Sequence, residues 1–282
     1  PQLAKMLAQA ACDSKDERFA DFELSDEQWE ELHIAAWLHD CGKVTTPEYV
    51  VDKSTKLETI YDRIHEIRMR FEVLKRDVEI DYWQALAGGA DPAGQQASME
   101  RALEQLDDDF EFVARCNVGG EMMSDEDLSR LRAIAERTWR RTLDDRIGIS
   151  WEEGQRKGQT EAPVLPFDEA LIADKAEHLF VRGGEDLFGV GNPHQFKMDV
   201  PELLYNRGEL YHLSVRRGTL TEEERFKINE HMVQTITMLN QLPYPSHLRN
   251  VPEIAGGHHE TMDGNGYPKR LTKEEMSLTA RM

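Results

Sequence analysis

Apolar residues recur at helical spacing along most of this 282-residue chain, and this period narrows the choice of fold more than any other feature. Three segments show it clearly: 1–20, 26–40 and 221–241. Ser25 and Thr221 stand where a helix N-cap is expected, directly before two of these segments. The sequence shows no alternating strand pattern of comparable length. It therefore predicts an all-α fold.

A second group of helical patterns lies in the middle of the chain and is rich in opposite charges. We predict three helices there, over about 57–86, 97–115 and 124–143. Glycines and a proline at 88–92 separate the first from the second, and Ser124 with Asp127 forms a capping box for the third. These helices resemble an antiparallel hairpin that projects from a core.

The remaining segments are harder to read. Segment 144–200 is rich in glycine and proline, which predicts mostly loop with one short helix near 168–180. The last segment, 274–282, is predicted to be a helix that is cut off in progress. Since the chain also starts at Pro1, we expect both ends to be internal to a larger protein.

Charge and composition exclude some classes of function. Lys and Arg total 34 against 54 Asp and Glu, and the net charge of -20 argues against binding a nucleic-acid polymer. No apolar run approaches the roughly 18 residues of a membrane span, and three irregularly spaced cysteines indicate no disulfide framework. A cytoplasmic location is the expectation. An anionic substrate would need local positive charge, which bound metal ions can supply.

Two clusters carry the side chains that bind metals. His39 and Asp40 end an apolar helix, and Gly42 and Lys43 follow them. A carboxylate can bridge two hard cations, an imidazole can bind one, and a lysine there can contact phosphate. The alternative to metal binding is a capping Asp beside a half-buried His. A short motif of this kind, taken alone, favours this alternative.

The second cluster makes coincidence the weaker explanation. His258 and His259 stand beside Glu260, and His231 lies on the helix before them. No cysteine accompanies these histidines at zinc-ribbon spacing, so the ligand set favours iron or manganese over zinc. The glycine-rich turn 263–268, which taken alone is an ordinary loop, follows three residues after Glu260. There it would place Tyr267 beside the metals.

With these motifs in this order, the chain resembles the HD-GYP family of phosphodiesterases. The resemblance implies an HD-domain helical bundle that holds two or three divalent metal ions, iron or manganese. It implies hydrolysis of cyclic di-GMP, or a related cyclic dinucleotide, to the linear dinucleotide or GMP in bacterial second-messenger signalling. The implied metal ligands are His39, Asp40, His231, His258 and His259. The implied catalytic residues are Asp40 and Lys43, and the implied substrate-binding residues are Lys43, Arg217, Gly266, Tyr267 and Pro268.

The chain departs from the family pattern in three places. The usual upstream Glu or His ligand should precede Pro1, and a later Asp ligand with its substrate motif should follow Met282. The third departure is a long interruption before His231. We therefore predict a first part of the core at 1–57, an inserted hairpin and loop region at 58–205, and a second part of the core at 206–282.

The interruption leaves two candidates for one ligand position. His231 follows Leu220 by eleven residues, as the family pattern asks, whereas His65 follows Leu57 by only eight. We favour His231, and we interpret His65 as a partly exposed residue on the first hairpin helix. Arg216, Lys269 and Arg270 are further candidate phosphate contacts, although basic residues near turns are more often simply solvated.

Two other functions compete with the phosphodiesterase. One is an HD-superfamily phosphohydrolase acting on mononucleotides, which the Gly-Tyr-Pro turn disfavours. The other is a non-catalytic signalling module that binds a cyclic dinucleotide or a partner, which the intact histidine sets disfavour. The hairpin predicts a homodimer or a partner-domain contact, and a sensory domain is expected upstream.

Overall fold

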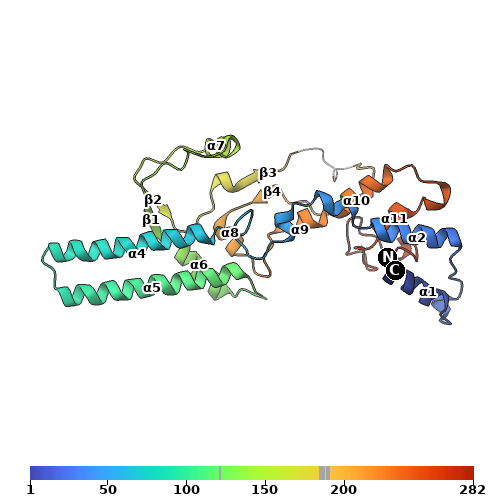
Figure 1. Ribbon diagram of the computed structural model, residues 1–282, viewed down its shortest axis with the longest axis horizontal. Helices are drawn as coiled ribbons and strands as arrows, with labels where there is room; N and C mark the ends of the chain where they lie inside the picture. The colour runs from blue at the N-terminus through green and yellow to red at the C-terminus, as the bar shows by residue number, and fades with distance from the viewer. Residues whose placement is uncertain (121, 184–187, 189–190) are drawn as a thin grey trace. The chain divides into compact units, whose positions relative to one another are not determined.

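The computed structural model describes residues 1–120, 122–183, 188 and 191–282 (Figure 1). The chain forms two compact units. Unit 1 combines Pro1–Val51, Gly183–Pro201 and Glu224–Met282, and unit 2 combines Asp52–Arg182 with Glu202–Glu223. The chain therefore leaves unit 1 after Val51 and comes back to it twice.

Unit 1 is built from short helices. They are α1 (Gln2–Cys12), α2 (Asp26–Leu38), α3 (Glu48–Val51), α10 (His231–Asn240) and α11 (Val251–Gly256), with most of α9 (Glu222–Asn229) and the 3₁₀ turns η1 (Glu17–Phe19), η2 (Cys41–Thr45), η4 (Ser246–Leu248) and η5 (Lys273–Glu275). Ser25 and Gln28 form a capping box that starts α2. Leu32 of α2, Leu239 of α10 and Val251 of α11 are buried in one cluster. This packing brings the C-terminal ends of α2 and α11 close to the first turn of α10.

Unit 2 contains a long helical hairpin. Its elements are α4 (Ile64–Ala87), α5 (Pro92–Val118), α6 (Asp125–Ala135), α7 (Trp151–Lys157), α8 (Glu209–Leu213), η3 (Ala176–His178) and the strands β1 (Thr138–Arg141), β2 (Phe167–Ala170), β3 (Leu179–Val181) and β4 (Leu203–Asn206). Helices α4 and α5 run side by side in opposite directions, as predicted (Figure 1). Asp91 caps α5 by accepting a hydrogen bond from Gly94 N, and Pro92 occupies its first turn. Ile67, Phe71 and Val113 are buried between the hairpin helices and their neighbours.

Two predicted helices of unit 2 are wrong in part. The helix over 124–143 ends at Ala135, and residues 138–141 form β1, which pairs antiparallel with β2. In place of the short helix predicted near 168–180, the structure has β2, the 3₁₀ turn η3 and β3. Strand β3 pairs with β4. Pairing with strands far away in the sequence satisfies these backbone groups, so local periodicity could not show it.

The predicted terminal helix at 274–282 is also wrong. Only the turn η5 forms there, started by a capping box between Thr272 and Glu275. The backbone is extended at Met276, and Ser277 then donates two hydrogen bonds to the Glu253 carboxylate. These hydrogen bonds take the place of the backbone hydrogen bonds that a helix would form. The helix predicted over 221–241 is present, and it is divided into α9 and α10 at Glu230.

The all-α prediction is confirmed, because helices dominate and the described residues hold only two two-stranded sheets. No helix in the described part of the chain is long and apolar enough to span a membrane.

Candidate metal centre

Three separate segments of unit 1 bring histidines and a carboxylate together. His39 and Asp40 follow α2, His231 begins α10, and His258 and His259 follow α11. Two overlapping groups have ligand atoms within 4.8 Å of one another, and these are His231 with His258 and His259, and His39 with Asp40 and His258. The structure therefore brings together all five residues that the sequence predicted as metal ligands.

Gly42 allows the close approach on which this arrangement depends. A Cβ atom at Gly42 would lie 2.1 Å from His231 O and 2.6 Å from Thr235 N, so only glycine fits between η2 and α10. The Gly42 N–H also donates a hydrogen bond of 2.9 Å to Thr235 Oγ1. This contact sets Asp40, two residues earlier, against the start of α10.

The backbone fixes how three of the imidazoles present their nitrogen atoms. In His39, His231 and His258, Nδ1 lies 3.0, 2.5 and 2.8 Å from the carbonyl oxygen three residues earlier. A carbonyl oxygen only accepts hydrogen bonds, so each Nδ1 carries the proton and donates it. In the neutral ring, Nε2 is then left with a lone pair. This is how proteins orient histidine ligands.

Two buried acceptor atoms of the cluster face each other with no hydrogen atom between them. Asp40 Oδ1 lies 3.4 Å from His231 Nε2 and 3.6 Å from His258 Nε2. Asp40 Oδ1 and His231 Nε2 are both buried, and neither has a hydrogen-bond partner among the described residues. Two lone pairs that face each other in a buried site are unfavourable, and a cation between them would satisfy both. The residues therefore fit a metal ion.

The protonation states of the cluster suit the same role. Burial raises the pKa of Asp40, but the hydrogen bond from Lys43 opposes this effect, and the pKa lies below its usual value. Burial lowers the pKa of His258, and burial with its histidine neighbours lowers the pKa of His259 to about 4. At neutral pH these groups are thus an ionised carboxylate and neutral imidazoles, the forms that bind metals.

The second oxygen of Asp40 faces basic groups. Lys43 Nζ donates to Asp40 Oδ2 at 2.7 Å, and His39 Nε2 lies 3.1 Å from the same oxygen. The Lys43 side chain is 56% exposed, so its ammonium also reaches the surface of the cluster. Lys43 is therefore placed beside the predicted metal site and is also tied to Asp40.

The turn 263–268 folds back onto the histidines. The ring of Tyr267 stacks on His259 with centroids 4.7 Å apart and planes 16° from parallel, and Tyr267 N donates to His259 O at 3.1 Å. A Cβ atom at Gly266 would lie 2.3 Å from Thr261 N, so glycine is required there. Pro268 follows Tyr267 in the same turn. Three of the predicted substrate-binding residues therefore lie next to the cluster.

Glu260 has a role that the sequence analysis did not assign. Its carboxylate accepts hydrogen bonds from Lys269 N at 2.6 Å and Leu271 N at 2.8 Å. Glu260 is absent from both ligand groups, and it holds the chain that leaves the turn. Its position directly after His259 was the only signal in the sequence.

Segment 192–199 also contacts this turn, and the sequence gave no indication of it. Phe196 is buried and packs against Val233 and Ile236 of α10. Lys197 N donates to Pro268 O at 2.8 Å, and Arg270 forms an ion pair of 2.6 Å with Asp199. We call residues 192–199 the strap.

Two predicted site residues belong to unit 2. His65 lies on α4 and its Nδ1 is 2.6 Å from Arg68 Nη1, so His231 is the candidate that joins the cluster. Arg217 is exposed beside Gly218, and its role in substrate binding stays a prediction. Arg216 forms an ion pair with Asp125.

Comparisons with known proteins give two partial matches. Residues 169–282 match the family model of an HD domain. Over 65 residues the chain is 35% identical to the 3'3'-cGAMP-specific phosphodiesterase 3 of Vibrio cholerae serotype O1, a match that covers 23% of this chain and 14% of that protein. No solved structure matched. The chain carries an HD domain, so the predicted resemblance is confirmed at that level.

Proposed function

We propose that this protein is a metal-dependent phosphodiesterase that hydrolyses a cyclic dinucleotide, either cyclic di-GMP or a relative such as 3'3'-cGAMP. The HD domain and the partial similarity to a cyclic-dinucleotide phosphodiesterase support a phosphohydrolase. Cytoplasmic signalling remains part of this proposal.

The observation that carries the proposal is the buried pair of acceptors. Asp40 Oδ1 and His231 Nε2 lie 3.4 Å apart without a hydrogen-bond partner among the described residues. A protein that used these groups only for stability would place a donor between them, because leaving a buried polar atom unpaired costs about 1–3 kcal/mol. A site that is satisfied by a cation explains the arrangement.

In this proposal His39, Asp40, His231, His258 and His259 hold two or three divalent metal ions, with iron or manganese expected. When bound, these ions supply Lewis acidity toward the phosphate and lower the pKa of water. Asp40 stays ionised, and His231 and His258 direct their Nε2 atoms toward Asp40 Oδ1.

The other residues position the substrate. Lys43, which is half exposed beside Asp40, is placed to neutralise a phosphate oxygen. Tyr267 presents a ring that His259 holds by stacking, and the turn around it gives backbone groups at the edge of the site. Arg217 is proposed as a further phosphate contact.

The test is hydrolysis of cyclic di-GMP and 3'3'-cGAMP by the purified protein, loaded anaerobically with iron or manganese. The parent should release linear dinucleotide or mononucleotide from at least one of them, and the Asp40→Asn variant should release none while its circular dichroism is unchanged. A parent that binds a cyclic dinucleotide without turnover would favour the non-catalytic module instead. Turnover of mononucleotides alone would favour the other HD-superfamily activity.

A further inference from the structure

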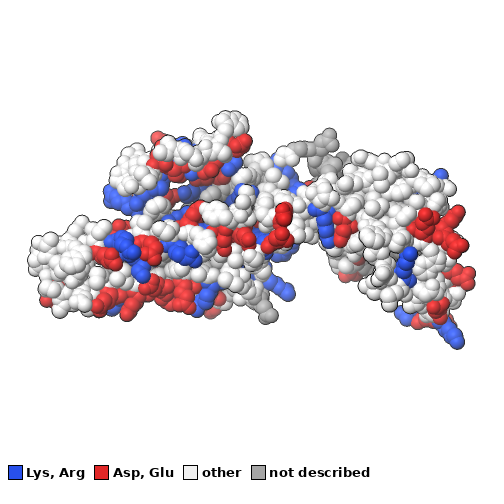
Figure 2. Space-filling view, viewed as in Figure 1, with Lys and Arg blue, Asp and Glu red and all other residues white. Residues whose placement is uncertain are grey.

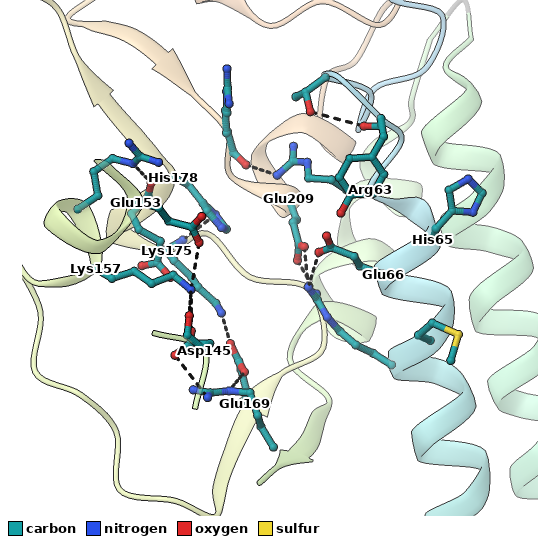
Figure 3. Close-up of a pocket in the computed structure, with 18 of the residues that line it drawn as sticks. Arg63, His65, Glu66, Asp145, Glu153, Lys157, Glu169, Lys175, His178 and Glu209 are labelled. Carbon is teal, nitrogen blue, oxygen red and sulfur yellow. Dashed lines mark hydrogen bonds and ion pairs between the residues drawn. The ribbon is translucent and has the colours of Figure 1, made fainter. Parts of the chain in front are cut away.

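Unit 2 contains a cavity of about 840 Å³ that has no part in the proposed reaction. Helix α4 forms one wall, and α7 with the segment around Lys175 and His178 forms another (Figure 3). The volume is in the range of sites that bind small organic molecules. A ligand would bind to those groups of the cavity that lack partners within the protein.

Most of the charged side chains in the cavity are already paired. Arg70 donates to both oxygens of Glu209 at 2.7 and 2.9 Å, and Lys157 forms an ion pair of 3.0 Å with Asp145. Figure 3 marks such pairs among the lining residues with dashed lines. Basic residues nevertheless slightly outnumber acidic ones among the lining residues, in a chain whose net charge is -20. Figure 2 shows both signs of charge over unit 2.

Arg156 on α7 differs from these paired residues. Its Nε donates to Glu177 O at 3.0 Å, and its guanidinium carbon lies 4.3 Å from the centre of the Phe180 ring. No carboxylate lies within ion-pair distance of Arg156 in the described part of the chain. The stacking fixes the plane of the guanidinium, and its terminal N–H groups remain available as a fork for an oxyanion.

The same cavity also has an apolar wall. Met69 and Val73, on the α4 wall, are 62% and 36% exposed. The cavity therefore combines the guanidinium fork of Arg156 with apolar surface.

We infer that this cavity binds a small organic anion, with a phosphate or carboxylate head at Arg156 and an apolar body against Met69 and Val73. The inference does not rest on the proposed phosphodiesterase activity, because every group that it uses belongs to unit 2.

The test is calorimetric titration of the metal-free protein with phenyl phosphate and with phenylacetate. These probes share an aromatic body and differ in the head, so together they separate a phosphate site from a carboxylate site. Benzyl alcohol, which lacks the anion, and inorganic phosphate, which lacks the body, are the reference probes. We expect one aromatic anion to bind at least about tenfold more tightly than either reference.

Variants locate the binding. Arg156→Gln should weaken the aromatic anion at least about tenfold, and Met69→Gln, which removes apolar surface from the α4 wall, about threefold. Arg140→Gln is the matched control, because Arg140 is exposed on the same strand as Trp139 and does not line the cavity. It should bind like the parent. Circular dichroism checks that each variant folds, and Met69→Gln keeps the test decisive if Arg156→Gln does not fold.

Two results would overturn the inference. One is that neither aromatic anion binds the parent more tightly than the references, or that Met69→Gln and a folded Arg156→Gln bind as the parent does. The other is that Asp40→Asn abolishes binding, which would place the probe at the metal centre of unit 1. An unchanged affinity in Asp40→Asn supports the cavity.

Discussion

Two carboxylates show how differently the two units treat the same chemical group. In unit 2, Glu209 is 3% exposed and both of its oxygens accept hydrogen bonds from the guanidinium of Arg70. In unit 1, Lys43 pairs with Asp40 Oδ2, but Asp40 Oδ1 is buried against His231 and has no partner among the described residues. Both oxygens of the first carboxylate are therefore satisfied within the protein, and one oxygen of the second is not.

This difference in hydrogen bonding indicates which of the two carboxylates is functional. A carboxylate whose two oxygens are both satisfied by the fold needs nothing further, whereas a buried carboxylate oxygen without a partner must take a cation from solution or carry a desolvation cost. Arg70 also holds the pKa of Glu209 low against the opposing effect of burial, so the pair is charged at neutral pH. We therefore assign stability to Glu209 and metal binding to Asp40.

The largest expected effect separates His231 from His65. His231→Asn should lower the rate of hydrolysis by about a thousandfold or more, because a lost ligand disturbs metals that the reaction requires. His65→Asn is the matched control and should keep the parent rate, since His65 contacts Arg68 in unit 2. Initial rates with saturating metal measure both. A full loss in His65→Asn with an active His231→Asn would reverse the assignment.

The next effect concerns the paired carboxylate. Glu209→Gln should reduce the free energy of unfolding by about 3 kcal/mol, because it leaves the Arg70 guanidinium buried without its main counter-charge. Glu72→Gln on the same helix as Arg70 should cost less than about 1 kcal/mol, because its ion pair with Arg76 is exposed. Urea titration measures both. Equal losses would contradict the distinction between buried and exposed pairs, and metal content should not change in either variant.

Unit 2 should also become less stable in acid. Burial lowers the pKa of His178 from 6.5 to about 4, and its Nδ1 accepts a hydrogen bond from Lys175 N, so the unfolded chain takes up the proton first as the pH falls. This part of the stability is complete above pH 6.5 and is lost between about 6.5 and 4, by about 1.4 kcal/mol for each pH unit. Urea titrations at pH 7.5 and 5.5 measure the loss. A His178→Gln variant should lose less than the parent between these two values, and an equal loss would remove His178 as the cause.

The smallest effect concerns the strap. Asp199→Ala removes the ion pair with Arg270, and because Asp199 is 93% exposed we expect only about a twofold rise in KM with kcat unchanged. Glu23→Ala, an exposed carboxylate elsewhere in unit 1, should change neither constant. A tenfold fall in kcat for Asp199→Ala would show that the strap acts on the chemistry rather than on binding.

The sequence predicted the ligand cluster well because short local patterns carried it. His39 and Asp40 stand at a helix end, His231 lies at a family spacing, and the paired histidines precede a glycine-rich turn. Each of these signals lies within a few residues. The structure adds how Gly42 brings the segments together, which depends on a backbone contact with α10 that no local pattern encodes.

The parts that could not be predicted depend on distant partners. The strands β1 and β2 pair across an interval of nearly thirty residues, and the strap reaches the turn at Pro268 from a segment without a clear period. The role of Glu260 depends on two backbone N–H groups about ten residues away. Such contacts come from tertiary packing, which overrides local propensity.

The most direct test of the account is the metal content of the parent and of Asp40→Asn after anaerobic loading with iron or manganese and removal of free metal. The account predicts that the parent retains metal and that Asp40→Asn loses most of it, because the carboxamide cannot balance the cation between Asp40 and His231. Equal metal content in a folded Asp40→Asn, or no metal in the parent, would contradict the central claim that the unpaired buried acceptors form a metal centre.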